Sequence, residues 1–439
     1  MAGKTPIGFN FCELSPQKLN PISQWDRDWL QAQKRPSGRL PLAIAVGATL
    51  IGTLLTGLPA AWAQETPAES APATTAEAPL RRLGPADVVD RQTRYALLRD
   101  NRLWQDRAAL LQAIDRSLAY LSTPAAQEAY TQYGMPEFTR DRVRRSLTRF
   151  RQLLRTSNSL ESFQTAILNE FELYQSIGRD GEGTVDFTGY FEPIYPASRV
   201  RTVEFRYPLY REPANLAQWP QPHPTRLELE GIDGLQGSQG RLRGLELVWL
   251  RNRLDAYLIQ VQGSARLQLA NNGIMTVGYA GRTEHPYVSL GRELINDGKV
   301  PAEGLTLPVV IDYFRQHPDE LNEYISRNNR FIFFQETAGH PPLGSLNVPV
   351  TSERSIATDK TVMPPGALAL IYTNLPYPDR DGRLFSQRVS RFVLDQDTGG
   401  AIQGPGRVDI FMGTGPVAGD RAGLVNNPGE LYYLLLREP

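Results

Sequence analysis

Short apolar runs separated by Gly, Pro and Asn dominate the chain from Gly183 onward. Runs of this length between turn-forming residues are typical of buried strands, and many of them at short spacing favour small β barrels. The runs predicted as strands lie at residues 245–250, 256–261, 330–335, 367–372, 392–394 and 431–436. Two helices, at about 287–296 and 308–315, are expected to interrupt them.

Upstream of Gly183 the apolar residues recur every three or four positions, the period of an amphipathic helix. Each spacing buries one stripe of a helix, so this region is predicted to be a packed helical region rather than a ligand site. The patterns are Leu110, Leu111, Ile114, Leu118 and Leu121; Val143, Leu147, Phe150 and Leu154; and Phe163, Ile167, Leu168, Phe171 and Tyr174.

The longest apolar run, residues 40–61, carries no charge. Lys34, Arg35 and Arg39 precede it, and Ala61-Trp62-Ala63 follows it. A basic segment, an apolar segment and a small-x-small signature indicate an export signal cleaved before Gln64. The alternative is an uncleaved anchor helix, because the run approaches the ~20 residues that span a bilayer. Either interpretation places the remainder outside the cytoplasm, in the periplasm.

Composition bounds the function. A length of 439 residues predicts about two domains, and a formal net charge of +0 gives no support to nucleic-acid binding. A neutral polysaccharide or wall fragment fits better. The single cysteine, Cys12, excludes an internal disulfide, and the four histidines lack ligand spacing, so neither a metal nor a cofactor is expected.

The densest candidate chemistry lies near the C-terminus, where Asp397 and Asp409 bracket a glycine-rich run. Val408, Ile410 and Phe411 make Asp409 resemble a strand residue. A carboxylate on a rigid strand beside an open glycine loop suits acid/base chemistry. Asp397 could equally cap its own turn.

Four further runs lie upstream of this segment, at residues 187–193, 261–265, 278–282 and 350–355, and with the segment 397–411 they make five runs in order. Together they resemble the membrane-bound lytic murein transglycosylase A family, which cuts the glycan strands of peptidoglycan and carries a C-terminal three-aspartate barrel domain. Family members are often lipoproteins. Here no apolar run precedes Cys12, so a lipid anchor does not carry over.

The resemblance implies a mainly β fold with an N-terminal helical region: a double-psi β-barrel domain with an inserted smaller β-barrel domain. The expected organisation follows the chain. Residues 1–63 form a cytoplasmic segment with the signal or anchor, 64–85 a disordered spacer, 86–194 the helical region and first barrel segment, 195–326 the inserted domain, and 327–439 the rest of the barrel.

The resemblance makes Asp409 the single catalytic acid/base. It would protonate the glycosidic oxygen and then take the proton of the C6 hydroxyl, which attacks C1 and closes a 1,6-anhydro ring. For the first step Asp409 must hold a proton near neutral pH, which requires desolvation or a nearby like charge. Asp397 could supply that charge, and a structural or positioning role is favoured for it.

Substrate binding or support is predicted at two runs: Thr188, Gly189, Tyr190 and Glu192, and then Gln262, Gly263 and Ser264. In the first, an aromatic ring can stack on a sugar while glycine leaves room for it. In the second, amide and hydroxyl groups can meet N-acetyl groups. The alternatives are a strand end with Tyr190 in the core, and a hairpin turn. Glu353 and Arg354 are interpreted as a solvated pair or as a support for the barrel loop.

The predicted function is a lytic transglycosylase, a carbon–oxygen lyase that cleaves the β-1,4 bond between N-acetylmuramic acid and N-acetylglucosamine. A hydrolase pairing Asp409 with Glu192 and a non-catalytic wall-binding module like the expansins are the alternatives. Expected partners are glycan strands and cell-wall synthesis or division complexes, with the chain a monomer and no nucleic acid bound.

Overall fold

Helices fill most of the chain before the second strand of the computed structural model, which describes residues 78–84 and 91–438. They are α2 (Arg91–Leu97), α3 (Arg107–Tyr120), α4 (Pro124–Gln132), α5 (Arg140–Thr156) and α6 (Leu160–Glu170). Thr139 and Ser159 cap α5 and α6 by accepting backbone N–H groups, as their short oxygen-bearing side chains favour. The apolar stripes predicted from the sequence are buried or partly buried on α3, α5 and α6.

The third predicted helical pattern is wrong at its end. Phe171 and Tyr174 lie on strand β2 (Phe171–Ser176), since α6 ends at Glu170. Both side chains are buried. The apolar positions of α6 and of the strand that follows it therefore look like one helical pattern in the sequence.

The predictions for residues 1–63 lie outside the described residues, as does most of the spacer predicted at 64–85. Its end differs from the prediction, because Leu80–Arg82 forms strand β1 and pairs antiparallel with β2. Leu80 is buried there, which a polar spacer would not provide.

The larger sheet has eight strands in the order β1-β2-β14-β11-β12-β10-β13-β3, and β14 also pairs with β3. That last pairing closes the strands from β14 to β3 into a ring. Parallel pairs join β10 to β12 and β13 to β3, while the other pairs are antiparallel. The strands not yet bounded are β3 (Val185–Glu192), β10 (Ser355–Ala357), β11 (Leu368–Pro378), β12 (Leu384–Asp397), β13 (Arg407–Thr414) and β14 (Asn426–Leu436).

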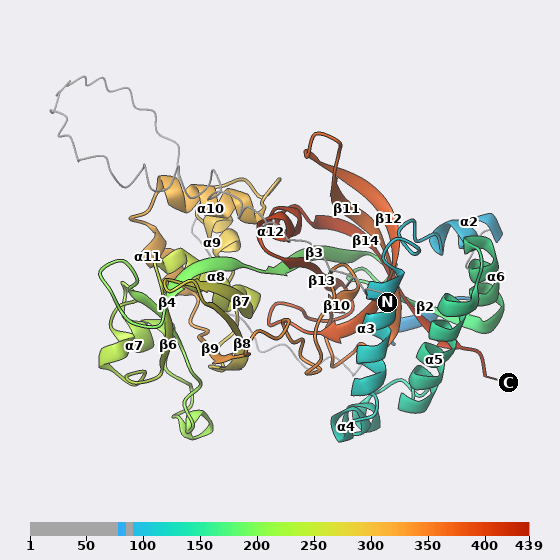
Figure 1. Ribbon diagram of the computed structural model, residues 1–439, viewed down its shortest axis with the longest axis horizontal. Helices are drawn as coiled ribbons and strands as arrows, with labels where there is room; N and C mark the ends of the chain where they lie inside the picture. Colours follow the sequence, from blue (N-terminus) through green and yellow to red (C-terminus); the bar gives the residue numbers. More distant parts are fainter. Residues whose placement is uncertain (1–77, 85–90, 439) are drawn as a thin grey trace, which may run out of the picture. The chain divides into compact units, whose positions relative to one another are not determined.

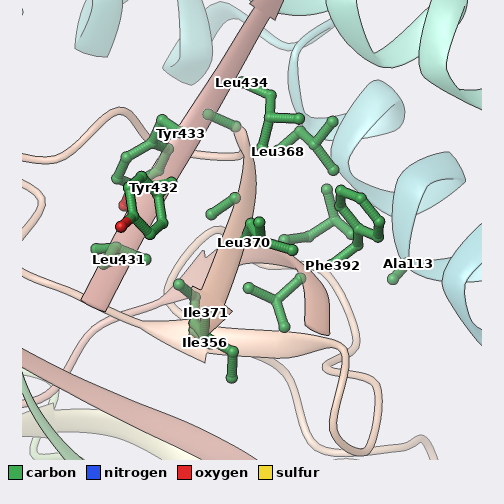
Figure 2. Packing of buried hydrophobic residues seen from close by; sticks show 14 of the residues in the cluster. Ala113, Ile356, Leu368, Leu370, Ile371, Phe392, Leu431, Tyr432, Tyr433 and Leu434 are labelled. Atoms are coloured by element: carbon green, nitrogen blue, oxygen red, sulfur yellow. The ribbon is translucent and has the colours of Figure 1, made fainter. Parts of the chain in front are cut away.

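The main core lies between this barrel and the helices. Figure 2 shows Leu368, Leu370 and Phe392 packed together with residues of β14, and Ala113 of α3 on the helical side. α3 and α5 lie alongside β12 and β14 (Figure 1). Burial of these side chains stabilises the barrel by roughly 1.5 to 3 kcal/mol for each large residue.

The smaller sheet has six strands in the order β5-β6-β4-β7-β8-β9, and a bridge between Arg211 and Phe334 brings the end of β5 back to β9. Its strands are β4 (Ile194–Ser198), β5 (Tyr207–Tyr210), β6 (Glu246–Leu250), β7 (Ser264–Leu269), β8 (Ile274–Arg282) and β9 (Ile332–Glu336). The described residues are therefore mainly β, with a six-stranded barrel and additional helices. The smaller sheet continues past residue 326, where the sequence interpretation ended the inserted domain.

Helices and short 3-10 turns connect the strands of both sheets. They are α7 (Arg226–Glu230), α8 (Arg253–Gln262), α9 (Leu290–Asn296), α10 (Leu307–Gln316), α11 (Leu321–Arg327), α12 (Pro416–Gly423), η1 (Leu216–Gln218) and η2 (Gly237–Gln239). α9 and α10 lie close to the two helices predicted within the β region.

One predicted strand is a helix. The apolar run 256–261 lies in α8, where Asn252 accepts the N–H of Asp255 at the start and Gly263 ends the helix with φ 77°. A short apolar run does not distinguish a buried helix from a strand, and here the capping residues on either side decide. The other predicted strand runs overlap β6, β9, β11, β12 and β14.

Candidate active site

Asp397 and Asp409 stand on either side of the short strand β10. Asp409 on β13 pairs with Ala357, and Asp397 at the end of β12 pairs with the same residue. Neighbouring strands are about 4.8 Å apart, so the two aspartate backbones are separated by roughly 10 Å. The barrel topology thus brings both predicted aspartates to one place, without the direct contact of a carboxylate pair that shares a proton.

Asp409 is held through one oxygen. Its Oδ1 accepts hydrogen bonds from the Thr188 hydroxyl and from Arg407 Nε, the latter at 2.7 Å. Arg407 Nη2 also donates to the Thr188 hydroxyl at 2.8 Å, which closes a three-residue cluster. The Asp409 side chain is 21% exposed, and within the described residues its Oδ2 has no hydrogen-bond partner. One carboxylate oxygen is therefore anchored while the other is free to meet a ligand.

Asp397 is tied into its own loop. Its Oδ1 accepts the N–H groups of Ser345 and Thr398, each at 2.8 Å, and its Oδ2 accepts the Tyr190 hydroxyl at 2.8 Å. Burial raises the pKa of Asp397, and these three hydrogen bonds act in the opposite direction. Both oxygens already have donors, so the side chain orders the loop.

Tyr190 and Gly189 both pack against neighbouring elements of the barrel. Burial, followed by the charge of Asp397, raises the pKa of Tyr190 well above its ordinary value, so its hydroxyl remains a donor to Asp397. Its ring lies 5.3 Å from that of Phe411. A Cβ on Gly189 would lie 2.7 Å from the Cα of Ala422 in α12. The close approach of α12 thus requires a glycine here, and the room for a sugar that the sequence suggests stays a prediction.

Glu192 lies apart from this cluster. It is 1% exposed, and its Oε2 accepts the Thr414 hydroxyl at 2.8 Å. Arg266 is the nearest cation, at 3.6 Å. Among residues 91–438, no hydrogen bond joins Glu192 to Asp409.

Gln262, Gly263 and Ser264 form the passage from α8 into β7 rather than a hairpin turn. Gln262 Oε1 accepts the backbone N–H of Phe191 at 3.1 Å, so the amide links this turn to the end of β3. Ser264 is buried. Gln262 thus helps to hold the end of β3, the strand that carries Thr188 and Tyr190. Within the described residues, none of the three forms a hydrogen bond with Asp409.

Arg407 is a site residue that sequence reasoning missed. It lies two positions before Asp409 on β13, and alternate residues of a strand share a face. That spacing was the available signal, because it places a guanidinium beside the carboxylate. Among residues 78–84 and 91–438, no group of three His, Cys, Asp or Glu side chains could hold a metal ion.

Comparisons with known proteins identify the family of this chain. Residues 186–335 match the family model described as the MltA specific insert domain, and residues 354–435 match the 3D domain. The chain is 32% identical over 266 residues to membrane-bound lytic murein transglycosylase A of Escherichia coli strain K12, covering 60% of this chain and 69% of that protein. The Vibrio cholerae protein of the same name is 31% identical over 281 residues, covering 63% and 72%.

Solved structures give the same result for the fold. A crystal structure of E. coli MltA with bound chitohexaose superimposes with a TM-score of 0.58 at 26% identity, covering 74% of this chain and 89% of that one. A membrane-bound lytic murein transglycosylase from Agrobacterium tumefaciens matches with a TM-score of 0.62 at 24% identity, covering 82% and 98%, which supports the fold. The chain therefore belongs to the membrane-bound lytic murein transglycosylase A family, whose members are lyases that act on peptidoglycan.

Proposed function

We propose that this enzyme cleaves the β-1,4 bond between N-acetylmuramic acid and N-acetylglucosamine and leaves 1,6-anhydromuramic ends, with Asp409 as its only acid/base. One observation carries the proposal: Asp409 is fixed by Thr188 and Arg407 through Oδ1, while Oδ2 is without a partner among the described residues. Such a carboxylate can carry a proton on the free oxygen without losing its position.

The reaction needs no second carboxylate. Protonated Oδ2 donates to the glycosidic oxygen as the bond from C1 to that oxygen breaks. The C6 hydroxyl of the same muramic residue then bonds to C1, and its proton returns to Oδ2. Arg407 stabilises the carboxylate after it has given up the proton, because opposite charges at hydrogen-bond distance attract.

Arg407 also opposes the protonated form that the first step requires. We infer that bound glycan excludes water from Asp409 and thereby favours the neutral acid, since desolvation penalises the charged form. Thr188 keeps Oδ1 oriented through both halves of the reaction.

The hydrolase that pairs Asp409 with Glu192 has less support. Glu192 is almost completely buried and bonded to Thr414, so it is poorly placed to activate a water. A wall-binding module without catalysis, like the expansins, requires no free carboxylate oxygen. Both alternatives are tested by the products: hydrolysis gives reducing ends, and binding alone gives none.

For the fold, we propose that the ring from β14 to β3 is a double-psi barrel and that the smaller sheet is a domain inserted between β3 and β10. The family-model match to an insert domain at 186–335 supports this arrangement, with an end nearer residue 336 than 326. The substrate is proposed to be the glycan strand itself, and the related E. coli protein holds chitohexaose in its crystal structure.

For localisation, we propose export to the periplasm by the segment 40–61, with cleavage before Gln64. The curated relatives are named membrane-bound, and no helix among the described residues is long and apolar enough to cross a membrane. N-terminal sequencing of the exported protein tests the proposal. A mature chain that begins at Gln64 supports it, and a membrane-held chain that retains residues before 40 contradicts it. Monomeric state and contacts with wall-synthesis or division complexes remain predictions.

A further inference from the structure

Two arginines of the smaller sheet region meet the glycine-rich loop between Asp397 and Asp409. Arg282 is the last residue of β8, and Arg330 lies between α11 and β9. A Cβ built on Gly400 would collide with Nη1 of Arg330 and lie 3.3 Å from Nη1 of Arg282. Both guanidinium groups therefore lie close to the backbone of Gly400, and they are neighbours of one another.

Neither arginine has a carboxylate partner among the described residues. The Arg330 side chain donates only through Nε, to the carbonyl oxygen of His285 at 2.7 Å, and the Arg282 side chain forms no hydrogen bond or ion pair within the described part of the chain. Glu212 lies 2.5 Å from a Cβ built on Gly281, next to Arg282 in the sequence, but forms no ion pair with Arg282. Burial, followed by the charge of Arg282, lowers the pKa of Arg330. Two like charges held together are relieved by an anion.

The pair lies against the loop that connects Asp397 to β13, the strand that carries Asp409. Burial raises the pKa of Tyr287, and its hydroxyl also interacts electrostatically with Asp409, Arg407 and Arg330. Tyr287 therefore lies within electrostatic range of both Asp409 and Arg330. Asp409 is already paired with Arg407, and Asp397 with Tyr190, so neither carboxylate neutralises the pair.

We propose that Arg282 and Arg330 bind a carboxylate of the glycan strand beside the bond that Asp409 cleaves, an inference that rests on the proposed function. Planar guanidinium groups recognise carboxylates with paired hydrogen bonds. Muramic residues bear a lactyl carboxyl group, whereas N-acetylglucosamine is neutral. In peptide-free strands that carboxylate is free. In peptide-bearing strands it is an amide, and the carboxylates belong to the peptide.

Binding to the full chain carrying Asp409→Asn tests this, because that change is intended to stop turnover. The ligands are a peptide-free strand of alternating N-acetylglucosamine and N-acetylmuramic acid, a peptide-bearing strand and neutral chitohexaose. We expect Arg282→Gln with Arg330→Gln to weaken binding of a carboxylate-bearing strand by about 10- to 100-fold, the range for a charge-assisted hydrogen bond. Chitohexaose binding should change less than about twofold. Arg243→Gln is the matched control, because Arg243 is exposed and its side chain forms no hydrogen bond or ion pair with the described residues.

The ligand arms distinguish the two sources of carboxylate. Loss confined to the peptide-free strand assigns the lactyl group, and loss confined to the peptide-bearing strand assigns the peptide. Equal weakening of chitohexaose binding, or no weakening of any ligand, overturns the proposal. The binding measurements test the two arginines and do not depend on which product the enzyme forms. The proposed reaction is tested separately, by the products of the wild-type enzyme.

Gly400→Ala is a second variant that leaves both arginines in place. The new methyl group would displace the end of the Arg330 side chain, which is flexible, rather than the backbone. It should reproduce the selective loss in part, and Gly134→Ala, where nothing lies within 4 Å of the added Cβ, should not. Normal carboxylate binding by a folded Gly400→Ala variant, checked by its thermal midpoint, would also count against the proposal.

Discussion

Arg354 and Arg391 each contact two carboxylates, whereas Arg282 and Arg330 contact none among the described residues. Arg354 pairs with Asp100 and Asp106, and Arg391 pairs with Asp106 and Glu353. We call Asp100, Asp106, Glu353, Arg354 and Arg391 the buried charge network. It joins the start of the helical region to the barrel loop that contains Glu353.

Burial explains the difference. Arg354 and Arg391 are 0% and 1% exposed, and an unpaired ion so deep in the protein would cost several kcal/mol. Arg282 is exposed and Arg330 partly exposed, so solvent stabilises their charge until a ligand replaces it. A hollow of about 220 Å³ borders the buried charge network, and none of the predicted site residues lines it. The two deeply buried arginines are thus paired with carboxylates of the protein, whereas Arg282 and Arg330 can accept an anion from outside as their partner.

Asp409→Asn should produce the largest effect on activity, because it removes proton transfer at the free oxygen. We expect cleavage of purified sacculi to fall by ~100- to 10,000-fold. The free energy of unfolding should fall by about 1 kcal/mol or less, because asparagine keeps a carbonyl oxygen that can accept from Thr188 and Arg407. Turbidity assays and denaturant unfolding measure the two quantities. Activity within about tenfold of wild type would place the acid elsewhere, first at Asp397.

Arg354→Met should have the opposite profile, with a loss of stability by about 3 to 5 kcal/mol because Asp100 is left buried without its partner. Urea unfolding checks this, with Arg243→Met as the exposed control. A loss below about 1 kcal/mol would show that the network is not needed for folding.

The sequence predicted less of the buried charge network than of the site. The aspartates and Thr188 could be found because a motif and an alternating strand pattern place them. Glu353 and Arg354 were interpreted as a solvated pair or a loop support. The interpretation as a solvated pair is wrong, because both side chains are buried. Arg354 donates to Asp100, and Glu353 accepts from Arg421. Adjacent opposite charges in a sequence do not reveal partners such as Asp100, more than two hundred residues away.

Arg282 and Arg330 could not be predicted from the sequence for a related reason. They come from β8 and from the segment before β9, and only the closure of the smaller sheet brings both to Gly400. The run 278–282 contains Arg282, but nothing local distinguishes it from a solvated arginine. Gly400, by contrast, was recognised as part of an open loop.

Glu353 gives the buried charge network a pH dependence. Burial favours its neutral form, but Arg391 and then Arg421 outweigh that effect and lower the pKa of Glu353 to about 2 from 4.5. A lowered folded-state pKa stabilises the protein above the unfolded value and loses that contribution as pH falls through the folded value. Between about pH 5 and 2, wild type should lose a few kcal/mol more stability than Glu353→Gln, at ~1.4 kcal/mol per pKa unit. Parallel curves for the two proteins would contradict this.

Thr188→Val should reduce activity less than Asp409→Asn does, by about 10- to 100-fold. It removes the hydroxyl that donates to Asp409 Oδ1 and accepts from Arg407, and a hydrogen bond to a charged group contributes roughly 1.5 to 3 kcal/mol. Thr188→Ser keeps the hydroxyl and should retain most activity. Equal loss in the two variants would mean that the methyl group, and not the hydroxyl, matters.

The products released from purified sacculi by the wild-type enzyme test the central claim most directly. Mass spectrometry distinguishes a 1,6-anhydromuramic end from a reducing end, because hydrolysis adds one water. A single free carboxylate oxygen on Asp409 predicts anhydro ends throughout. Reducing muramic ends as the main product would show that water attacks C1, and would contradict the account of a single acid/base residue.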